Sequence, residues 1–333
     1  MGLLGRRLRV VLLVHNTSVW YSLSELWHLM DRAHDVDPVV VSLPKHFAGK
    51  GELAGEKDAH AALSARGVPH LRCEVGSDPL ALLRILAPDV VFRQSQWDHD
   101  IDPRLSTANL AFTRLCLVPY EMLNIITNVS RPGTKDTAVD MALHNEAWLV
   151  FGTAATVAAA QKKGRRQGSQ FRVVGHPKVE ALRAAEPEWP LAGRLPRVFW
   201  STHHSLGNGW TGFGQFDVTR ADFLEWARSG TAEIAWQPHP GLRSRVATGR
   251  GRLSAAELDE WRSEWDALPC AATSTDRYPA LLAACNVVVT DGISTLLEGQ
   301  VTGRPVIFLE REGHVPSTRR VRWSCGESTA CAQ

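Results

Sequence analysis

The stretch from Cys285 to Glu310 constrains the fold more than any other part of the chain. It contains four segments: the apolar, β-branched run 286–290, the polar turn 291–294, the helical segment 295–301 and the apolar run 306–309. Short β-branched runs of this kind are typical of strands buried on both faces. The stretch therefore predicts a strand–turn–helix–strand unit of an open parallel sheet. Such sheets bind ligands at the carboxyl ends of their strands.

The same alternation of strands and helices occupies the rest of the chain. The expected strands are 8–14, 37–43, 69–73, 89–93, 115–118, 148–151, 171–174, 198–201 and 232–236, and the expected helices are 19–33, 53–66, 80–86, 136–145, 153–163, 222–228, 255–265 and 278–284. Alternation over short loops predicts an α/β fold with parallel sheets that are covered on both faces. No GxGxxG fingerprint follows the first strand, so a nicotinamide-dependent dehydrogenase is not indicated.

The length of the chain predicts two domains, because 333 residues exceed one ordinary hydrophobic core. Residues 186–197 (EPEWPLAGRLPR) contain three prolines and no apolar period, and they are the expected linker. We therefore expect a Rossmann-like domain at 1–185 and a second Rossmann-like domain at 198–333. The two domains are expected to face each other across a cleft that holds a two-part ligand.

Composition limits the classes of function. The net charge of +2 gives no indication of a nucleic-acid-binding protein, and the six cysteines have no CxxC or zinc spacing, as expected in a reducing cytoplasm. The apolar run at the start of the chain is too short to span a membrane. Two basic runs, 162–166 and 319–322, indicate solvated surface or peripheral contact with the anionic inner face of a membrane.

Polar turns follow three strands of the second half, and these turns hold the candidate site residues. They are His203, His204 and Ser205 after the first strand, His239 after the second, and Asp291 to Thr295 after the third. Free N–H groups at a helix start, beside a hydroxyl group, suit a phosphate. The alternative is that Asp291 and Ser294 only cap a helix, and that His239 is a polar turn residue held between two prolines.

Three segments, taken in this order and at this spacing, resemble the CDP-glycerol glycerophosphotransferase family of teichoic-acid and polysaccharide biosynthesis. They are WSTHHSL, WQPHP and VVVTDGISTLLEGQVTGRPVIF. In the first half, VHNTSVW, PVVVSLP, LVPY and VVGHPK resemble a branch of polysaccharide-biosynthesis relatives, so the resemblance extends from about Leu8 to about Phe308. It implies the two-domain glycosyltransferase type B fold, a nucleotide-linked donor bound by the second domain, and a polysaccharide or lipid-linked glycan acceptor.

The resemblance also implies roles for individual residues. His239 would contact the donor pyrophosphate, and Ser294 with its neighbours Gly292 and Thr295 would hold the phosphates. Asp291 and Glu298 would shape the pocket and the ribose contacts, while His203, His204 and Ser205 would face the phosphates. Imidazolium, hydroxyl and helix N-terminal N–H groups can stabilise a pyrophosphate leaving group without a metal. We therefore expect a CDP-glycerol-like donor substrate and no metal or other cofactor.

The chain departs from the family in the first domain. The family carries a Trp-His-Gly motif there, whereas the corresponding region reads LVPYEML. The substitute that we expect for the missing base is His15, at the end of the first strand, with Glu121 as the second choice. Asp98-His99-Asp100-Ile101-Asp102 is similar to the Asp-x-Asp motif of metal-dependent glycosyltransferases, but the interpretation that we favour is a solvated acidic loop without a metal.

Three functions therefore stay open. The first is a transferase that moves a polyol phosphate or a sugar from a nucleotide-activated donor. The second is a nucleotide-sugar epimerase with the same architecture. The third is a non-catalytic nucleotide-binding relative, which the missing Trp-His-Gly motif favours, together with a final segment, 311–333, in which we expect no closing helices.

Overall fold

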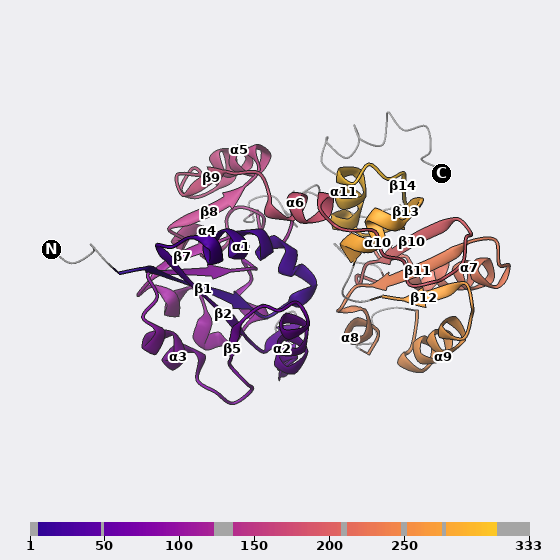
Figure 1. Cartoon of the computed structure of the whole chain (residues 1–333), viewed down its shortest axis with the longest axis horizontal. Helices are drawn as coiled ribbons and strands as arrows, with labels where there is room; N and C mark the ends of the chain where they lie inside the picture. Colours follow the sequence, from indigo (N-terminus) through magenta and orange to yellow (C-terminus); the bar gives the residue numbers. More distant parts are fainter. Residues whose placement is uncertain are drawn as a thin grey trace. The chain divides into compact units, whose positions relative to one another are not determined.

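The computed structural model describes residues 6–47, 50–122, 136–207, 212–247, 252–274 and 278–311. The chain forms two compact units, coloured from indigo to pink and from red to yellow in Figure 1, and the division falls between Glu180 and Ala181. The predictions made for the end of the chain, including the basic run 319–322, lie outside the described residues.

The first unit is built on a parallel sheet with the strand order β5-β2-β1-β6-β7-β8-β9. Its strands are β1 (Leu8–Val14), β2 (Val36–Ser42), β5 (His70–Arg72), β6 (Val90–Arg93), β7 (Arg114–Leu117), β8 (Leu149–Gly152) and β9 (Phe171–Val173). A separate antiparallel hairpin joins β3 (Lys45–Phe47) to β4 (Lys50–Ala54). The strand order changes direction at β1, which pairs with β2 on one side and β6 on the other.

Helices cover both faces of this sheet. They are α1 (Ser24–Arg32), α2 (Glu56–Ala65), α3 (Pro79–Leu86), α4 (Ala142–Glu146), α5 (Ala154–Lys163) and α6 (Pro177–Arg183), with short 3-10 helices at Thr17–Ser22, Asp98–Asp100, Pro103–Leu105 and Ala108–Leu110. Side chains of a strand alternate between faces. Accordingly, Val11 and Leu13 of β1 pack in one core with residues of α3, α4 and α5. Leu12 and its neighbours pack in another core with Trp27 of α1 and Leu63 of α2.

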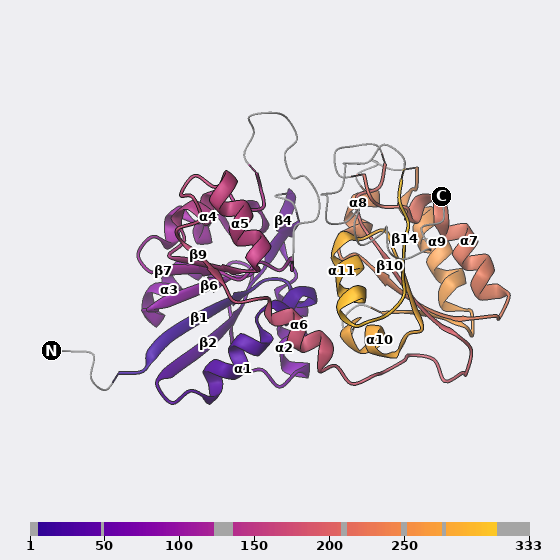
Figure 2. The same ribbon diagram turned by 90° about the horizontal axis from the view of Figure 1, so that it is seen from above.

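The second unit is a smaller parallel sheet with the order β12-β11-β10-β13-β14. Its elements are β10 (Arg197–Thr202), α7 (Phe216–Arg228), β11 (Glu233–Pro238), α8 (Leu242–Ala247), α9 (Ala255–Asp266), β12 (Ala271–Thr273), α10 (Tyr278–Ala284), β13 (Val287–Thr290), α11 (Ile293–Val301) and β14 (Val306–Phe308). Figure 2 shows α10 and α11 on one face of this sheet and α7 and α9 on the other.

An aromatic cluster forms the core between this sheet and helices α7 and α9. Trp200 of β10 is fully buried, and its ring stacks on Phe223 of α7 with centroids 3.8 Å apart. Trp236 of β11 and Trp265 of α9 lie against the same indole, at 6.0 and 5.7 Å. On the opposite face, α11 approaches the strands closely at Gly299, where a Cβ atom would lie 2.7 Å from Val306 Cγ2. A larger residue at position 299 would therefore separate the helix from the sheet.

Two helix starts follow directly from the local sequence. The Asp78 side chain accepts hydrogen bonds from the N–H groups of Leu80 and Ala81, while Pro79 occupies the first helical position of α3. Ser254 and Glu257 form a reciprocal capping box at the start of α9. Such side chains satisfy N–H groups that a helix cannot pair internally.

The structure confirms the predicted α/β fold with parallel sheets and corrects several element bounds. The predicted helix 53–66 is α2, Glu56–Ala65, because the residues before it form strand β4 and Gly55 adopts a left-handed φ of +83°. The predicted helix 136–145 begins only at Ala142. The Asp136 side chain accepts a hydrogen bond from Ala138 N and closes a turn there instead. Strands β3, β4 and β12 and helices α6 and α8 were not predicted.

The proline-rich segment predicted as a linker follows α6, belongs to the second unit and ends at Arg197, the first residue of β10. Glu188 N donates a hydrogen bond to Ala280 O, and the Arg197 guanidinium lies 5.7 Å from the Trp189 ring centre. In the basic run 162–166, Lys163 pairs with Asp136 and Arg166 donates to two carbonyl oxygens at the end of α4, so these two cations serve local structure. Over the described ranges, no helix has the length and apolar character needed to cross a bilayer.

The aromatic cluster leads to a stability prediction. Replacing Trp200 with Ala removes a fully buried indole, and we expect a loss of about 3–5 kcal/mol in the free energy of unfolding of the second unit. Trp226→Ala is the matched control, since Trp226 is 36% exposed in the same unit. Urea unfolding followed by circular dichroism measures both. Equal midpoints for the two variants would contradict the assignment of Trp200 as the centre of this core.

Candidate functional site

The candidate site lies at the carboxyl edge of the second sheet, where the strand order changes direction. Strand β10 pairs with β11 on one side and with β13 on the other. Loops that leave such a switch point diverge to opposite faces of the sheet, and this leaves room for a ligand at the strand ends. His203 follows β10, His239 follows β11 and Asp291 follows β13. The predicted site residues of the second half are thus brought to one edge.

Three histidine rings lie against one another at this edge. The ring centres of His203 and His204 are 4.4 Å apart, and those of His204 and His239 are 4.1 Å apart. Those of His203 and His239 are 5.2 Å apart. The backbone adds rigidity, since His239 N donates to Thr202 O at 2.9 Å and so extends the pairing of β10 with β11. The sequence separates His239 from the other two by more than thirty residues, and the parallel register brings them together.

The backbone fixes the tautomer of His239. Gly241 N donates a hydrogen bond to His239 Nδ1 at 3.0 Å. A backbone N–H group can only donate, so Nδ1 carries the lone pair and the proton of the neutral ring is on Nε2. His239 therefore presents an N–H donor on the side of the ring away from its own turn.

A chain of hydrogen bonds fixes His203 in the same way. Ser205 Oγ accepts from the N–H groups of Phe213 at 3.1 Å and Gly214 at 3.4 Å. Its own hydroxyl proton is then available to His203 Nδ1, which lies 2.7 Å away, and Ser205 N also donates to this nitrogen at 3.3 Å. The proton of the neutral His203 ring is consequently on Nε2. Ser205 acts in the site by orienting His203.

This tautomer pattern favours an anion over a metal ion. The ring nitrogens of His203, His204 and His239 lie within 4.8 Å of one another, the one grouping of potential metal ligands within the described part of the chain. A metal-bound histidine normally donates a hydrogen bond from its second ring nitrogen. In His203 and His239 that nitrogen accepts one, so cation binding would break these bonds. N–H donors on Nε2 suit phosphate oxygens.

Positive charge at the site comes from arginine, since the pKa values of His203 and His204 are both lowered and these two rings are neutral at pH 7. Burial lowers the pKa of His204 to about 4, with a further contribution from the positive charge of Arg245. Burial also lowers the pKa of His203 well below its ordinary value, and the neighbouring His204 adds to this effect. Arg245 lies on α8, six residues after His239, and the sequence interpretation missed it. The signal was available in HPGLRSR, where two arginines follow the histidine turn closely.

Helix α11 adds backbone donors and hydroxyl groups to the same edge. Gly292 precedes the helix, and no side chain caps its first turn. The first N–H groups of a helix have no partner within it and attract anions. Ser294 and Thr295 lie in that first turn, and Thr295 Oγ1 is 3.0 Å from Ser201 Oγ at the end of β10. The predicted phosphate-binding residues of this turn are therefore positioned beside the strand that leads to His203.

Asp291 is buried beneath the site and holds the loop that follows β10. Its carboxylate accepts a hydrogen bond from His203 N at 2.6 Å and another from Gln215 N at 2.5 Å. Burial raises the pKa of Asp291 to about 7, although the two N–H groups act in the opposite direction. Glu298 is buried too, with Tyr278 Oη donating to it at 3.5 Å. The ribose contacts predicted for these two acids stay a prediction.

The two residues predicted as bases, His15 and Glu121, belong to the first unit. Burial lowers the pKa of His15 to about 3, with help from the charges of Lys45 and Arg93, so this ring is a weak base. Burial raises the pKa of Glu121, and Gln96 Nε2 donates to its carboxylate at 3.4 Å. A carboxyl group with a raised pKa is the better suited of the two to proton transfer near neutral pH.

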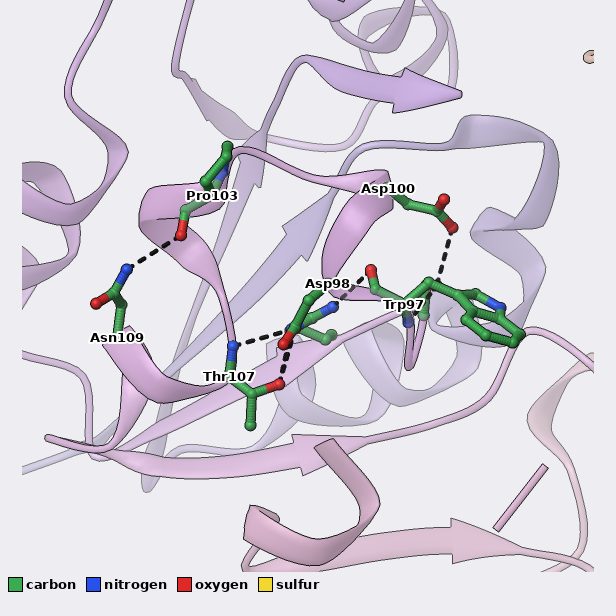
Figure 3. Close-up of polar contacts among 8 residues, drawn as sticks. Trp97, Asp98, Asp100, Pro103, Thr107 and Asn109 are labelled. Carbon is green, nitrogen blue, oxygen red and sulfur yellow. Dashed lines mark hydrogen bonds and ion pairs between the residues drawn. The ribbon is translucent and has the colours of Figure 1, made fainter. Parts of the chain in front are cut away.

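The acidic loop after β6 is organised by arginine and threonine. Figure 3 shows Asp98 accepting hydrogen bonds from Thr107 N at 3.1 Å and from Thr107 Oγ1 at 2.8 Å. Arg93, which is buried, forms an ion pair with the same carboxylate. The carboxylate of Asp102 is paired with Arg104. The carboxylates of Asp98 and Asp102 in the Asp-x-Asp-like segment are therefore already hydrogen-bonded or ion-paired to other residues of this loop and of β6.

The chain is similar in structure to several solved proteins, but its sequence matches no known family model or curated protein. The UDP-GlcNAc 2-epimerase from Neisseria meningitidis, solved with UDP-GlcNAc bound, is 11% identical with a TM-score of 0.63, over 96% of this chain and 86% of that chain. The UDP-GlcNAc 2-epimerase from Methanocaldococcus jannaschii, in complex with UDP-GlcNAc and UDP, is 12% identical with a TM-score of 0.54, over 96% and 86%.

The wall teichoic acid polymerase TagF, soaked with CDPG, is 9% identical with a TM-score of 0.52, over 91% of this chain and 70% of that chain. At these identities the likeness establishes the fold, which agrees with the predicted glycosyltransferase type B class. The predicted resemblance to glycerophosphotransferases is met in part, since a teichoic acid polymerase is among the similar structures. UDP-GlcNAc 2-epimerases give the higher TM-scores of these three.

The role of Asp291 can be tested with Asp291→Asn. The amide offers one acceptor oxygen and turns an NH2 group toward the second loop N–H, so we expect about 1–3 kcal/mol of destabilisation. We also expect weaker binding of pyrophosphate, because His203 loses its anchor. Urea unfolding and isothermal titration calorimetry measure the two effects. Asp222→Asn, at an exposed position of α7, is the control, and indistinguishable results for the two variants would refute this role.

The histidine site also predicts a pH dependence of anion binding. A bound anion raises the pKa of His204 from its low value of about 4, so binding takes up protons and sulfate affinity should rise as the pH falls from 7.5 to 5.5. One linked proton gives at most about tenfold per pH unit. In the absence of an anion, His204 has the opposite effect on stability, and it makes the free energy of unfolding fall as the pH falls. Folding lowers the pKa of His204 from 6.5, so its contribution to stability is present above 6.5 and lost toward pH 4.

The affinity for sulfate is measured by adding sulfate and following the NMR spectrum. Sulfate is suitable because its own charge does not change between pH 5.5 and 7.5. His204→Asn should flatten the pH profile. His28→Asn, at an exposed position in the first unit, should leave the profile unchanged. A sulfate affinity that is independent of pH in the unsubstituted protein would contradict the arrangement described above.

Proposed function

We propose that this chain is an enzyme that acts on a nucleotide-diphosphate-activated sugar and holds the diphosphate at the carboxyl edge of the second sheet. The reaction that we favour is epimerisation of the nucleotide sugar. In this proposal His203, His204, His239, Arg245 and the start of α11 bind the diphosphate.

The observation that carries the proposal is the orientation of the histidine rings. Hydrogen bonds from Gly241 N and from Ser205 leave Nε2 protonated in His239 and His203. Ring N–H donors, one guanidinium group and a helix N-terminus can bind a diphosphate through hydrogen bonds and a modest positive charge. The site needs no metal for this, and we propose that none takes part.

The choice of reaction is supported by the fold and by the chemistry of the first unit. The solved structures with UDP-GlcNAc are described as 2-epimerases. Epimerisation by proton transfer removes a proton from one face of the carbon centre and returns a proton to the opposite face. Glu121, whose carboxyl pKa is raised by burial, is suited to such a proton transfer. The Trp-His-Gly motif expected of a glycerophosphotransferase is missing from LVPYEML.

A second candidate is transfer of a polyol phosphate from a CDP-linked donor. The fold likeness to TagF, soaked with CDPG, favours it, and the same diphosphate site would serve. The acceptor would then be a polysaccharide or lipid-linked glycan. Lys162 and Arg165, which are exposed at the end of α5, would be the cations available for contact with an anionic membrane.

The deciding experiment is incubation with UDP-GlcNAc alone in deuterated water, followed by NMR. We expect conversion to an epimer with deuterium at the inverted carbon, and persistence of the activity in EDTA. Glu121→Gln should lower the rate by about 10²-fold or more, because the amide cannot transfer the proton. The control is Glu146→Gln, at an exposed position of the same unit.

The alternative outcomes have separate meanings. Consumption of CDP-glycerol with release of CMP, and no change of UDP-GlcNAc, would replace the epimerase by the transferase. Binding of UDP by calorimetry without turnover of any donor would favour the non-catalytic relative. Absence of binding for UDP, CMP and pyrophosphate would overturn the diphosphate site itself.

A further inference from the structure

The loop between β10 and α7 carries His203 and Ser205, and side chains brace it at both ends. Asp291 holds His203 at the start and Gln215 at the end. Ser205 ties the start to Phe213 and Gly214 inside the loop. The geometry of the histidine donors therefore depends on how well this loop is held.

A further brace comes from beyond the last strand. Arg311, three residues after β14, donates to Gly207 O at 3.1 Å and to Asp217 Oδ1 at 3.1 Å. Gly207 lies in the first half of the loop, with a left-handed φ of +83°, and Asp217 lies in the first turn of α7. One guanidinium group thus connects the two sides of the loop to the segment that follows β14.

The ion pair between Arg311 and Asp217 is largely buried, so its loss would be costly. The side chain of Asp217 is 2% exposed and that of Arg311 is 19% exposed. Asp291 is also buried, and the positive charge of Arg311 acts to lower its pKa. A buried carboxylate without a counter-charge is strongly unfavourable, so loss of the guanidinium would remove the ion-pair partner of Asp217 and a nearby positive charge from Asp291.

We propose that Arg311 is a positioning residue of the anion site, which fixes the loop that orients His203 and so couples the segment after β14 to the affinity for a diphosphate. The inference rests on the proposed function, because it takes the three histidines as the diphosphate site. Arg311 itself need not touch the ligand. Its effect passes through Asp217, Gly207 and Asp291 to the Nε2–H group of His203.

The test compares Arg311→Met with Arg304→Met. Both remove an arginine of the second unit that donates to a backbone carbonyl, and Arg304 donates to Ala283 O, away from the loop. Calorimetry with inorganic pyrophosphate measures affinity. Long-range proton–nitrogen NMR on nitrogen-labelled histidines reports the tautomer of His203 in the ligand-free protein, which a general loss of stability would not change.

We expect Arg311→Met to raise the Kd for pyrophosphate by about tenfold and to mix the His203 tautomers, with Arg304→Met unchanged in both respects. Arg311→Lys keeps the charge without the planar fork, so an intermediate effect is expected, and it serves if the Met variant does not fold. A Kd within twofold of the unsubstituted protein and an unchanged His203 tautomer would overturn the inference. If the unsubstituted protein binds no pyrophosphate, the proposed function fails, while the tautomer comparison still decides the role of Arg311.

Discussion

The site depends on the buried carboxylate of Asp291, which joins strand β13 to the loop after β10. Its two oxygens accept the N–H groups of His203 and Gln215, residues that begin and end the loop. Placing a carboxylate in the protein interior is costly unless hydrogen bonds and a counter-charge offset the loss of hydration. The two N–H groups and the nearby Arg311 offset part of this cost, and the pKa of Asp291 stays raised at about 7. One carboxylate therefore holds the described first and last residues of this loop, His203 and Gln215.

Topology explains why this carboxylate can reach the loop. Both sheets change direction at their first strand, β1 in the first unit and β10 in the second. Because all strands of a parallel sheet end at the same edge, turns that are distant in the sequence become neighbours there. In the second unit these turns contribute histidines and the N-terminus of α11. In the first unit they contribute His15, Gln94 and the residues around Glu121.

The two edges differ in their electrostatics. The second edge presents neutral imidazoles beside one guanidinium group, which suits the phosphate oxygens of a nucleotide. The first edge holds carboxyl groups whose pKa values are raised by burial, Glu121 and Asp100 among them. Carboxyl groups with raised pKa values hold a proton more strongly than ordinary ones, which is a common property of groups that transfer protons in active sites. This difference is the physical basis of the proposal that the second unit binds the diphosphate and that the first unit supplies a proton-transfer group.

Local sequence patterns were sufficient to predict the alternation of strands and helices, the α/β class and the turns that hold His203, His239 and Asp291. Hydrophobic periodicity and turn chemistry are local properties, so they can be read without coordinates. Predictions failed where a side chain competes with helix formation for backbone N–H groups. At 136–145 the Asp136 side chain closes a turn that the apolar pattern does not reveal.

The chemical properties of the site residues depend on contacts that form only in the folded chain. The tautomers of His203 and His239, the burial of Asp291 and Glu298, and the proximity of Arg245 to His204 all depend on contacts between segments or on the exact course of a turn. From the sequence alone, these histidines could bind either a metal ion or an anion. The direction of one backbone N–H group, that of Gly241, separates these possibilities for His239, because it fixes which ring nitrogen carries the proton.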